Sequence, residues 1–216
     1  MSRAYADIAF TPNVRALQTQ AGSRQAFARL DHASDARDRL GEDEAAFITA
    51  RDGFYQASVS ETGWPYVQFR GGPVGFVNVI DAKTIGYADF RGNVQYISTG
   101  NLVGNDRIAI IFMDYAKRTR LKLFGRVRLV SVAEDPALMA RLANPGYRAK
   151  VERAVIIRIE GVDWNCPQHI TPRFTEAEVD AEIQAAISPL REEIARLNVV
   201  MTTAIVYTRQ VGKNSG

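Results

Sequence analysis

The sequence predicts an α+β fold, mainly β, in which helices flank one antiparallel barrel or sandwich. Short segments with a two-residue hydrophobic period follow one another closely from residue 53, and turn residues separate them. The chain shows no alternation of strands with helices, so we do not expect a parallel sheet. The longer helical patterns lie toward the two ends of the sequence.

Composition indicates an ordinary globular protein without a nucleic-acid partner. The 216 residues suit one domain with extensions, and their 46% hydrophobic and 24% charged residues suffice for a core. The net charge of +3 comes from 27 basic and 24 acidic residues and is too small to favour nucleic-acid binding. Two histidines and one cysteine disfavour a zinc site, and we expect no metal.

The cysteine content and the apolar segments indicate in which cellular compartment the protein is expected. Cys166 is the single cysteine, so no disulfide can form within this sequence, which fits a reducing environment. Residues 1–10 do not resemble a secretory signal, and the apolar run 108–113 is too short to cross a bilayer. We therefore expect a cytoplasmic protein that does not enter a membrane.

Helical segments are expected at residues 12–21, 26–30 and 42–51. Pro12 suits a first helical turn, and the acidic residues 42–44 suit the positive end of a helix dipole. Expected strands cover residues 54–60, 65–70, 75–80, 84–89, 107–113, 118–130 and 154–161. On the second of these strands, Tyr66, Gln68 and Arg70 share one face. Residues 93–101 are expected to form a loop that leads into one helical turn, and residues 162–174 a polar loop.

A long helix is expected after the polar loop. Thr175 and Glu178 form a capping box, and Pro189 should kink the helix. A narrow apolar seam can pack on the chain's own barrel or on a partner subunit, and the sequence leaves both open. From Val211 onward we expect disorder. The seam consists of Val179, Ile183, Ile187, Leu190, Ile194 and Leu197.

The strand at 118–130 carries a row of cations. Because residues two apart share a face of a strand, Arg118, Arg120 and Lys122 point one way, while Leu121 and Leu123 point into the core. Gly125 favours a bulge at which Arg126 and Arg128 carry the cationic face onward. The cations repel one another unless an anion lies between them, as in a phosphate site. A solvated face that deters edge pairing is the alternative.

Residues 89–102 concentrate small and polar groups directly after a strand. Two glycines, side-chain amides and hydroxyls can hydrogen-bond a flat heterocycle or a phosphate. The same residues are common in turns, and taken alone this segment favours ordinary turn chemistry.

Four segments, residues 63–76, 88–102, 113–115 and 120–126, resemble the pyridoxamine 5'-phosphate oxidase-related FMN-binding split-barrel family, in the order that this family uses. Together they cover roughly residues 45–130, and residues 163–173 resemble the closing loop of one bacterial branch. The resemblance implies a split β-barrel of antiparallel Greek-key type. It also implies a homodimer with one FMN at each of two sites along the subunit interface.

The resemblance also implies a domain organisation and a set of site residues. We expect a helical extension at residues 1–45, the FMN-binding barrel at 46–165, and a closing loop with the last helix at 166–216. The expected cofactor-binding residues are Gln68, Phe69, Arg70, Gln95, Ser98, Asn101, Arg118, Arg120, Lys122, Trp164 and Gln168.

Two positions depart from the family pattern. Ser98 stands where the family usually has a phosphate-binding lysine, and Arg120 stands where it often has a glutamine near the flavin. We therefore hypothesise that the phosphate-binding charge has moved from the loop to the row Arg118, Arg120 and Lys122. Trp164 offers a stacking surface over the flavin ring, with a core or interface role as the alternative.

The implied activity is hydride transfer between the flavin and a small unidentified substrate, with oxygen or a nicotinamide as the other reactant. No catalytic residue can be assigned. The arginine and histidine motif of the true oxidases is matched only loosely by residues 167–173, so pyridoxamine phosphate is not implied as the substrate. Two alternatives remain: a flavin carrier or sensor without turnover, and a split barrel that binds haem or a deazaflavin.

Overall fold

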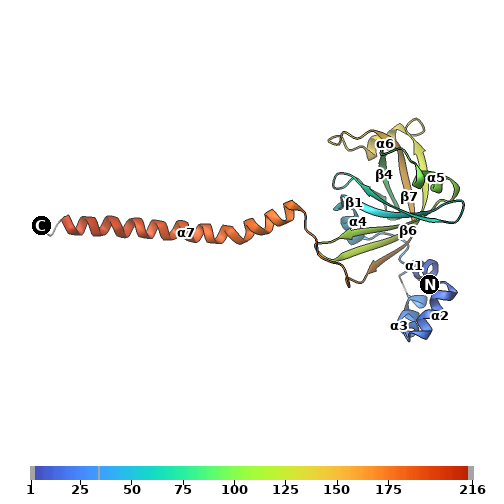
Figure 1. The fold of residues 1–216 in the computed structure, drawn as a ribbon, viewed down its shortest axis with the longest axis horizontal. Helices are drawn as coiled ribbons and strands as arrows, with labels where there is room; N and C mark the ends of the chain where they lie inside the picture. The colour runs from blue at the N-terminus through green and yellow to red at the C-terminus, as the bar shows by residue number, and fades with distance from the viewer. Residues whose placement is uncertain (1–2, 34, 214–216) are drawn as a thin grey trace. The chain divides into compact units, whose positions relative to one another are not determined.

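The computed structural model describes residues 3–33 and 35–213, which divide into two compact units between Thr171 and Pro172. The first unit holds one seven-stranded sheet in the order β2-β1-β5-β6-β7-β4-β3 (Figure 1). The three-domain division expected from the sequence remains a prediction. The strands are β1 (Gly53–Val59), β2 (Pro65–Gly71), β3 (Asn78–Asp81), β4 (Thr84–Phe90), β5 (Arg107–Asp114), β6 (Thr119–Ser131) and β7 (Val151–Asn165).

Every pairing in this sheet is antiparallel, which confirms the predicted fold class. The neighbours β1–β5 and β4–β7 are not consecutive in the chain, so the path crosses over in the manner of a Greek key. β2 and β3 stand at the two ends of the strand order, and the barrel is therefore split between them.

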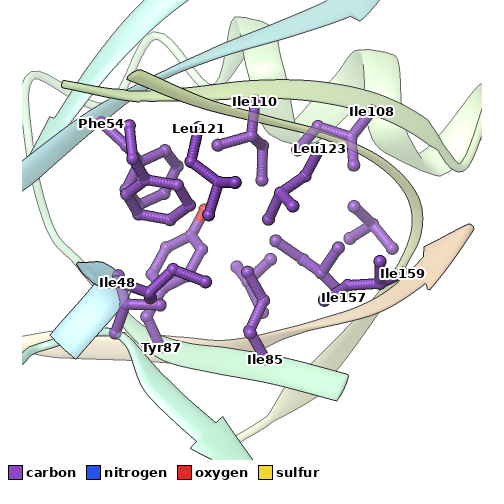
Figure 2. Close-up of a cluster of buried hydrophobic side chains, with 14 of the residues drawn as sticks. Ile48, Phe54, Ile85, Tyr87, Ile108, Ile110, Leu121, Leu123, Ile157 and Ile159 are labelled. Atoms are coloured by element: carbon purple, nitrogen blue, oxygen red, sulfur yellow. The ribbon is translucent and has the colours of Figure 1, made fainter. Parts of the chain in front are cut away.

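The curved sheet encloses one main hydrophobic core (Figure 2). Alternate residues of β5 and β6 point inward, and Leu121 and Leu123 of β6 are fully buried, as their spacing predicted. Ile48 of the helix α4 (Glu42–Thr49) and Tyr87 of β4 belong to the same cluster. Burial of side chains such as these contributes roughly 1.5–3 kcal/mol each relative to leaving them exposed.

The helices are α1 (Ala4–Ala9), α2 (Pro12–Gln20), α3 (Arg24–Ala28), the short 3₁₀ helix η1 (Arg29–His32), α4 (Glu42–Thr49), α5 (Ile97–Gly104), α6 (Pro136–Leu142) and α7 (Glu176–Lys213). The expected helices near residues 12, 26 and 42 are confirmed, whereas α1 and α6 were not predicted. The capping box is also confirmed, since Glu178 accepts a hydrogen bond from the backbone N–H of Thr175 at 2.8 Å. No helix within residues 3–33 and 35–213 is long and apolar enough to cross a membrane.

Several predicted boundaries were wrong. β3 begins at Asn78 and not at residue 75, because Gly75 adopts a φ of 79° in the turn that precedes it. The polar loop does not start at residue 162, because β7 continues to Asn165, which pairs with Arg120 of β6. The disorder expected from Val211 is contradicted as far as Lys213, where α7 ends; residues 214–216 lie outside the described residues.

Candidate functional site

A polar pocket lies where β2 and β4 meet the beginning of α5. Its enclosed volume is about 60 Å³. A second hollow shares Gln68, Arg70 and Asp89 with it and adds aromatic side chains, including Phe76 and Tyr87. The polar pocket is lined by Tyr66, Gln68, Arg70, Asp89, Phe90, Gly92, Asn93, Val94, Gln95, Tyr96, Ile97, Ser98, Thr99 and Glu152.

β2 supplies one wall of this pocket through alternate residues. Tyr66, Gln68 and Arg70 are half-buried and face the pocket, as their spacing of two predicted. The side chain of Phe69 lies on the other face of β2, where its ring centroid is 5.3 Å from that of Tyr55 on β1. The strand thus gives polar groups to the pocket and an apolar group to the outside of the barrel.

A charged network lies beneath the pocket. Arg70 Nη1 donates to Asp89 Oδ1 at 2.9 Å, and Arg153 Nε lies 3.5 Å from Asp89 Oδ2. Glu152 Oε2 is 3.0 Å from Arg153 Nη2, and Glu152 Oε1 is 3.6 Å from Arg91 Nε. Three guanidinium groups therefore share two carboxylates, which leaves one positive charge in excess beside the pocket.

Two features of the network distinguish Arg70 and Asp89. Burial raises the pKa of the Asp89 carboxyl above its ordinary value, although the nearby guanidinium groups of Arg70 and Arg153 oppose this. Arg70 Nε is buried and has no hydrogen-bond partner within the described structure. An unpaired buried donor is costly, so an acceptor that reached this N–H would relieve that cost.

The first turn of α5 opens toward the pocket. Its N-cap residue Tyr96 has a left-handed φ of 54°, and its side chain makes no capping hydrogen bond to the backbone N–H groups of this turn. The hydroxyl of Tyr96 instead donates to Glu152 Oε1 at 3.0 Å, which ties the loop to β7. A helix N-terminus beside an excess cation favours an anionic group such as a phosphate.

Polar side chains fix α5 against the sheet. The Ser98 hydroxyl donates to Gln68 Oε1 at 2.6 Å, and Asn101 Nδ2 donates to Ser58 Oγ at 3.0 Å. Ser98 lines the pocket, whereas the buried Asn101 lies below it and holds α5 to β1. Asn101 therefore positions the helix that carries Ser98.

The sequence matches the Pyridoxamine 5'-phosphate oxidase family over residues 40–164, which is more than half of the chain. The chain belongs to this family. The match begins just before α4 and ends within β7, so it contains every element that lines the pocket. No curated protein matches the chain.

Several solved structures show weak similarity to this member of the Pyridoxamine 5'-phosphate oxidase family. The Group A Streptococcus protein HupZ is 19% identical, with a TM-score of 0.47, over 58% of this chain and 99% of that one. A putative pyridoxamine 5'-phosphate oxidase from Lactobacillus delbrueckii is 17% identical, with a TM-score of 0.46, over 58% and 94%. An FMN-binding protein from Syntrophomonas wolfei is 14% identical, with a TM-score of 0.43, over 71% and 95%.

In this Pyridoxamine 5'-phosphate oxidase family member, the cationic row of β6 lies apart from the pocket. Arg118 lies in the preceding turn with a φ of 52°, and Arg120 and Lys122 follow on the outer face of β6. Arg120 Nη2 donates to the carbonyl of Cys166 at 3.2 Å. The expected bulge is confirmed, because the pairing of β6 with β7 shifts between Phe124 and Gly125.

The two remaining candidates also lie outside the pocket. Trp164 is on β7 and not in a loop; its Nε1 donates to Glu44 Oε1 at 2.5 Å and its ring packs on Phe47 of α4. Gln168 is exposed, and its backbone N–H lies 3.5 Å from the Cys166 sulfur. Trp164 therefore packs against α4, and the stacking role expected for it stays a prediction.

The polar pocket thus brings together four of the expected residues, Gln68, Arg70, Gln95 and Ser98, whereas Phe69 borders only the adjoining hollow. Sequence reasoning missed Tyr66, Asp89 and Glu152 as lining residues. The two-residue spacing of β2 could have indicated Tyr66, and Asp89 opens the polar segment already singled out. Glu152 carries no local signal, because only the pairing of β4 with β7 brings it to the pocket.

Proposed function

We propose that this protein is a flavoprotein that binds FMN, with the phosphoryl group beside Arg70 and the first turn of α5. Membership of the Pyridoxamine 5'-phosphate oxidase family supports flavin binding. The observation that carries the choice of a phosphorylated flavin is the buried, unpartnered Nε of Arg70 within a cluster of net positive charge. Charge-assisted hydrogen bonds from a guanidinium to a phosphate are short and strong.

The chain's own residues would orient the cofactor. The Ser98 hydroxyl donates its hydrogen bond to Oε1 of Gln68. The N–H₂ group of the same amide would therefore donate to a carbonyl oxygen or ring nitrogen of the flavin. Phe76 and Tyr87 supply apolar surface in the adjoining hollow. The bound flavin would supply hydride transfer to or from a small unidentified substrate, with oxygen or a nicotinamide as the second reactant.

The proposal includes a homodimer, because the outer face of β1, β2 and β5 is apolar and exposed. Phe69 and Val67 are 56% and 62% exposed, and Tyr55 pairs with Phe69 on one side and Ile111 on the other. An exposed patch of this kind marks an association surface. The next strand, β6, carries Arg120 and Lys122 beside this patch.

This placement gives the cationic row its proposed role. Because Arg118, Arg120 and Lys122 do not line the pocket of their own protomer, they would serve the cofactor of the neighbouring protomer across the apolar face. Trp164 and Gln168 would contribute from the same side. The site is then complete only in the dimer.

Titration of FMN and riboflavin against Arg70→Met tests the phosphate assignment, since riboflavin lacks the phosphoryl group. Loss of a charged hydrogen bond of about 1.5–3 kcal/mol should weaken FMN binding roughly 10- to 100-fold and leave riboflavin binding nearly unchanged. Arg128→Met is the matched control, because Arg128 is an exposed barrel arginine paired with Glu134. Equal losses for both flavins, or none for FMN, would overturn the assignment.

Arg70→Met leaves Asp89 with one guanidinium partner fewer, so the double variant Arg70→Met/Asp89→Asn controls for a folding defect. The absorption spectrum of the purified protein separates FMN from haem or a deazaflavin. Bleaching by NAD(P)H with recovery in air would separate an oxidoreductase from a carrier or sensor.

A further inference from the structure

The helix α7 has features that flavin binding does not require. It runs through 38 residues as one continuous helix (Figure 1), which corresponds to about 57 Å at ~1.5 Å per residue. Helices in water gain most of their stability from burying an apolar stripe, and propensity alone contributes little. We therefore expect another apolar surface to cover the apolar stripe of α7.

The stripe follows a heptad pattern. Its members recur at alternating spacings of four and three, which places them at consecutive a and d positions. Leu190, Ile194 and Met201 are 63%, 58% and 60% exposed. The stripe consists of Ile183, Ile187, Leu190, Ile194, Leu197 and Met201.

We propose that α7 pairs in parallel and in register with α7 of a second copy of this chain, as a two-stranded coiled coil. The a positions hold Ile187, Ile194 and Met201, and the d positions hold Ile183, Leu190 and Leu197. β-branched residues at a with leucine at d favour two parallel strands over higher assemblies.

The residues outside the stripe are compatible with this pairing. Pro189 falls at a c position, so its ring lies on the face away from the partner helix. In the parallel register each g position faces an e position of the partner helix five residues further on. Glu193 then faces Asn198, and Ala186 faces Arg191, so neither of these pairs brings like charges together. Asp180, at the a position that precedes the stripe, would face its own copy.

The buried area is sufficient for a specific contact. Burying one aliphatic side chain removes roughly 60–120 Å² from water on the transfer scale. Twelve such side chains, six from each helix, then bury about 700–1,400 Å², which overlaps the lower end of the size range of stable interfaces, about 1,200–2,000 Å². A second copy meets this requirement because it presents the identical stripe.

Disulfide trapping in the full chain tests the pairing and its register. In a Cys166→Ser background, Leu190→Cys places a thiol in a facing layer, whereas Glu192→Cys places one on the outer face two residues away. Only facing positions bring two Cβ atoms within the ~3.5–4.5 Å that a disulfide needs. We expect mild oxidation to convert the Leu190→Cys chain mainly to a covalent dimer on a non-reducing denaturing gel, and to leave Glu192→Cys monomeric.

Equal cross-linking of the two variants, or a Leu190→Cys chain that stays monomeric after oxidation, would overturn the coiled coil. A second measurement uses Ile194→Asp without any added cysteine. This variant should lose helical circular dichroism and sediment with less self-association at low concentration, whereas unchanged values for both would count against the pairing. Cross-linking requires no flavin, so a chain that binds no FMN would leave this inference standing.

Discussion

The Ser98 hydroxyl donates a 2.6 Å hydrogen bond to Oε1 of Gln68, and this contact joins the first turn of α5 to β2 at the pocket. Because Oε1 of Gln68 accepts this hydrogen bond, the N–H₂ group is the end of the amide that would contact a ligand. In the proposed flavin site, Ser98 would therefore act as an orienting group for Gln68.

Ser98→Ala should weaken FMN binding. Loss of one hydrogen bond of about 0.5–1.5 kcal/mol corresponds to a roughly 2- to 10-fold rise in Kd. Riboflavin should be affected equally, because the bond orients Gln68 and does not contact the phosphoryl group. Ser98→Thr keeps the hydroxyl and should restore affinity; a threonine variant as weak as the alanine variant would contradict the orienting role.

Arg120→Ala should also weaken FMN binding, roughly 10-fold or more if a charged hydrogen bond is lost. Because Arg120 does not line the pocket of its own protomer, this effect requires a second subunit. The affinity of the wild type should therefore fall when the protein is diluted below its dimerisation constant, in a fluorescence titration at several protein concentrations. Unchanged FMN affinity in Arg120→Ala would contradict the proposal that the cationic row contacts the cofactor.

Stability should depend on pH through Asp89. Burial raises the pKa of Asp89 in the folded chain above the ordinary 3.8, so the folded state holds the proton more tightly than the unfolded chain. Its contribution to stability therefore declines as pH rises from 3.8 toward the raised pKa. The side chain in Asp89→Asn does not titrate. In urea unfolding, the stability of this variant relative to the wild type should therefore increase as the pH rises from 3.8 toward the raised pKa of Asp89.

Asp35 provides a control of opposite sign. Its pKa is lowered below 3.8, chiefly by a hydrogen bond from the backbone N–H of Arg37, so its ionised form stabilises the folded state. The stability of Asp35→Asn relative to the wild type should therefore decrease as the pH rises toward 3.8. The same sign for both variants would show that the assignment of Asp89 to a desolvated carboxyl is wrong.

Gly125→Ala should destabilise the barrel. A Cβ at Gly125 would stand 2.6 Å from the backbone carbonyl oxygen of Arg158, at the bulge between β6 and β7. Relieving this clash requires the backbone to move. Overpacking of this kind typically lowers the free energy of unfolding by about 1–3 kcal/mol. Gly100→Ala is the matched control, because its Cβ would meet no atom within 4 Å and alanine favours a helix by about 1 kcal/mol.

Much of the fold followed from periodicity alone. The two-residue spacing along β2 and β6 assigned Gln68 and Arg70 to one face and Leu121 and Leu123 to the core, and the glycine at 125 marked the bulge. Strand alternation and glycine conformation are local properties that a dozen residues express. The segments that resemble the family are likewise short stretches of chain, each of which contains at most one strand with the turn or helical turn next to it.

The composition of the candidate site could not be obtained in this way. Asp89 and Arg153 are 64 positions apart, and they meet because β4 pairs with β7 when the barrel forms. The same closure puts Arg120 and Lys122 on the outer face, apart from the pocket that Arg70 lines.

The sequence by itself therefore determined the antiparallel fold class, the inward and outward faces of its strands and the family. Only the tertiary structure decided that Arg70, and not the β6 cations, lies over the buried carboxylate Asp89. The physical reason is that side-chain alternation is set within a strand, whereas charge pairing at the pocket is set by which strands become neighbours.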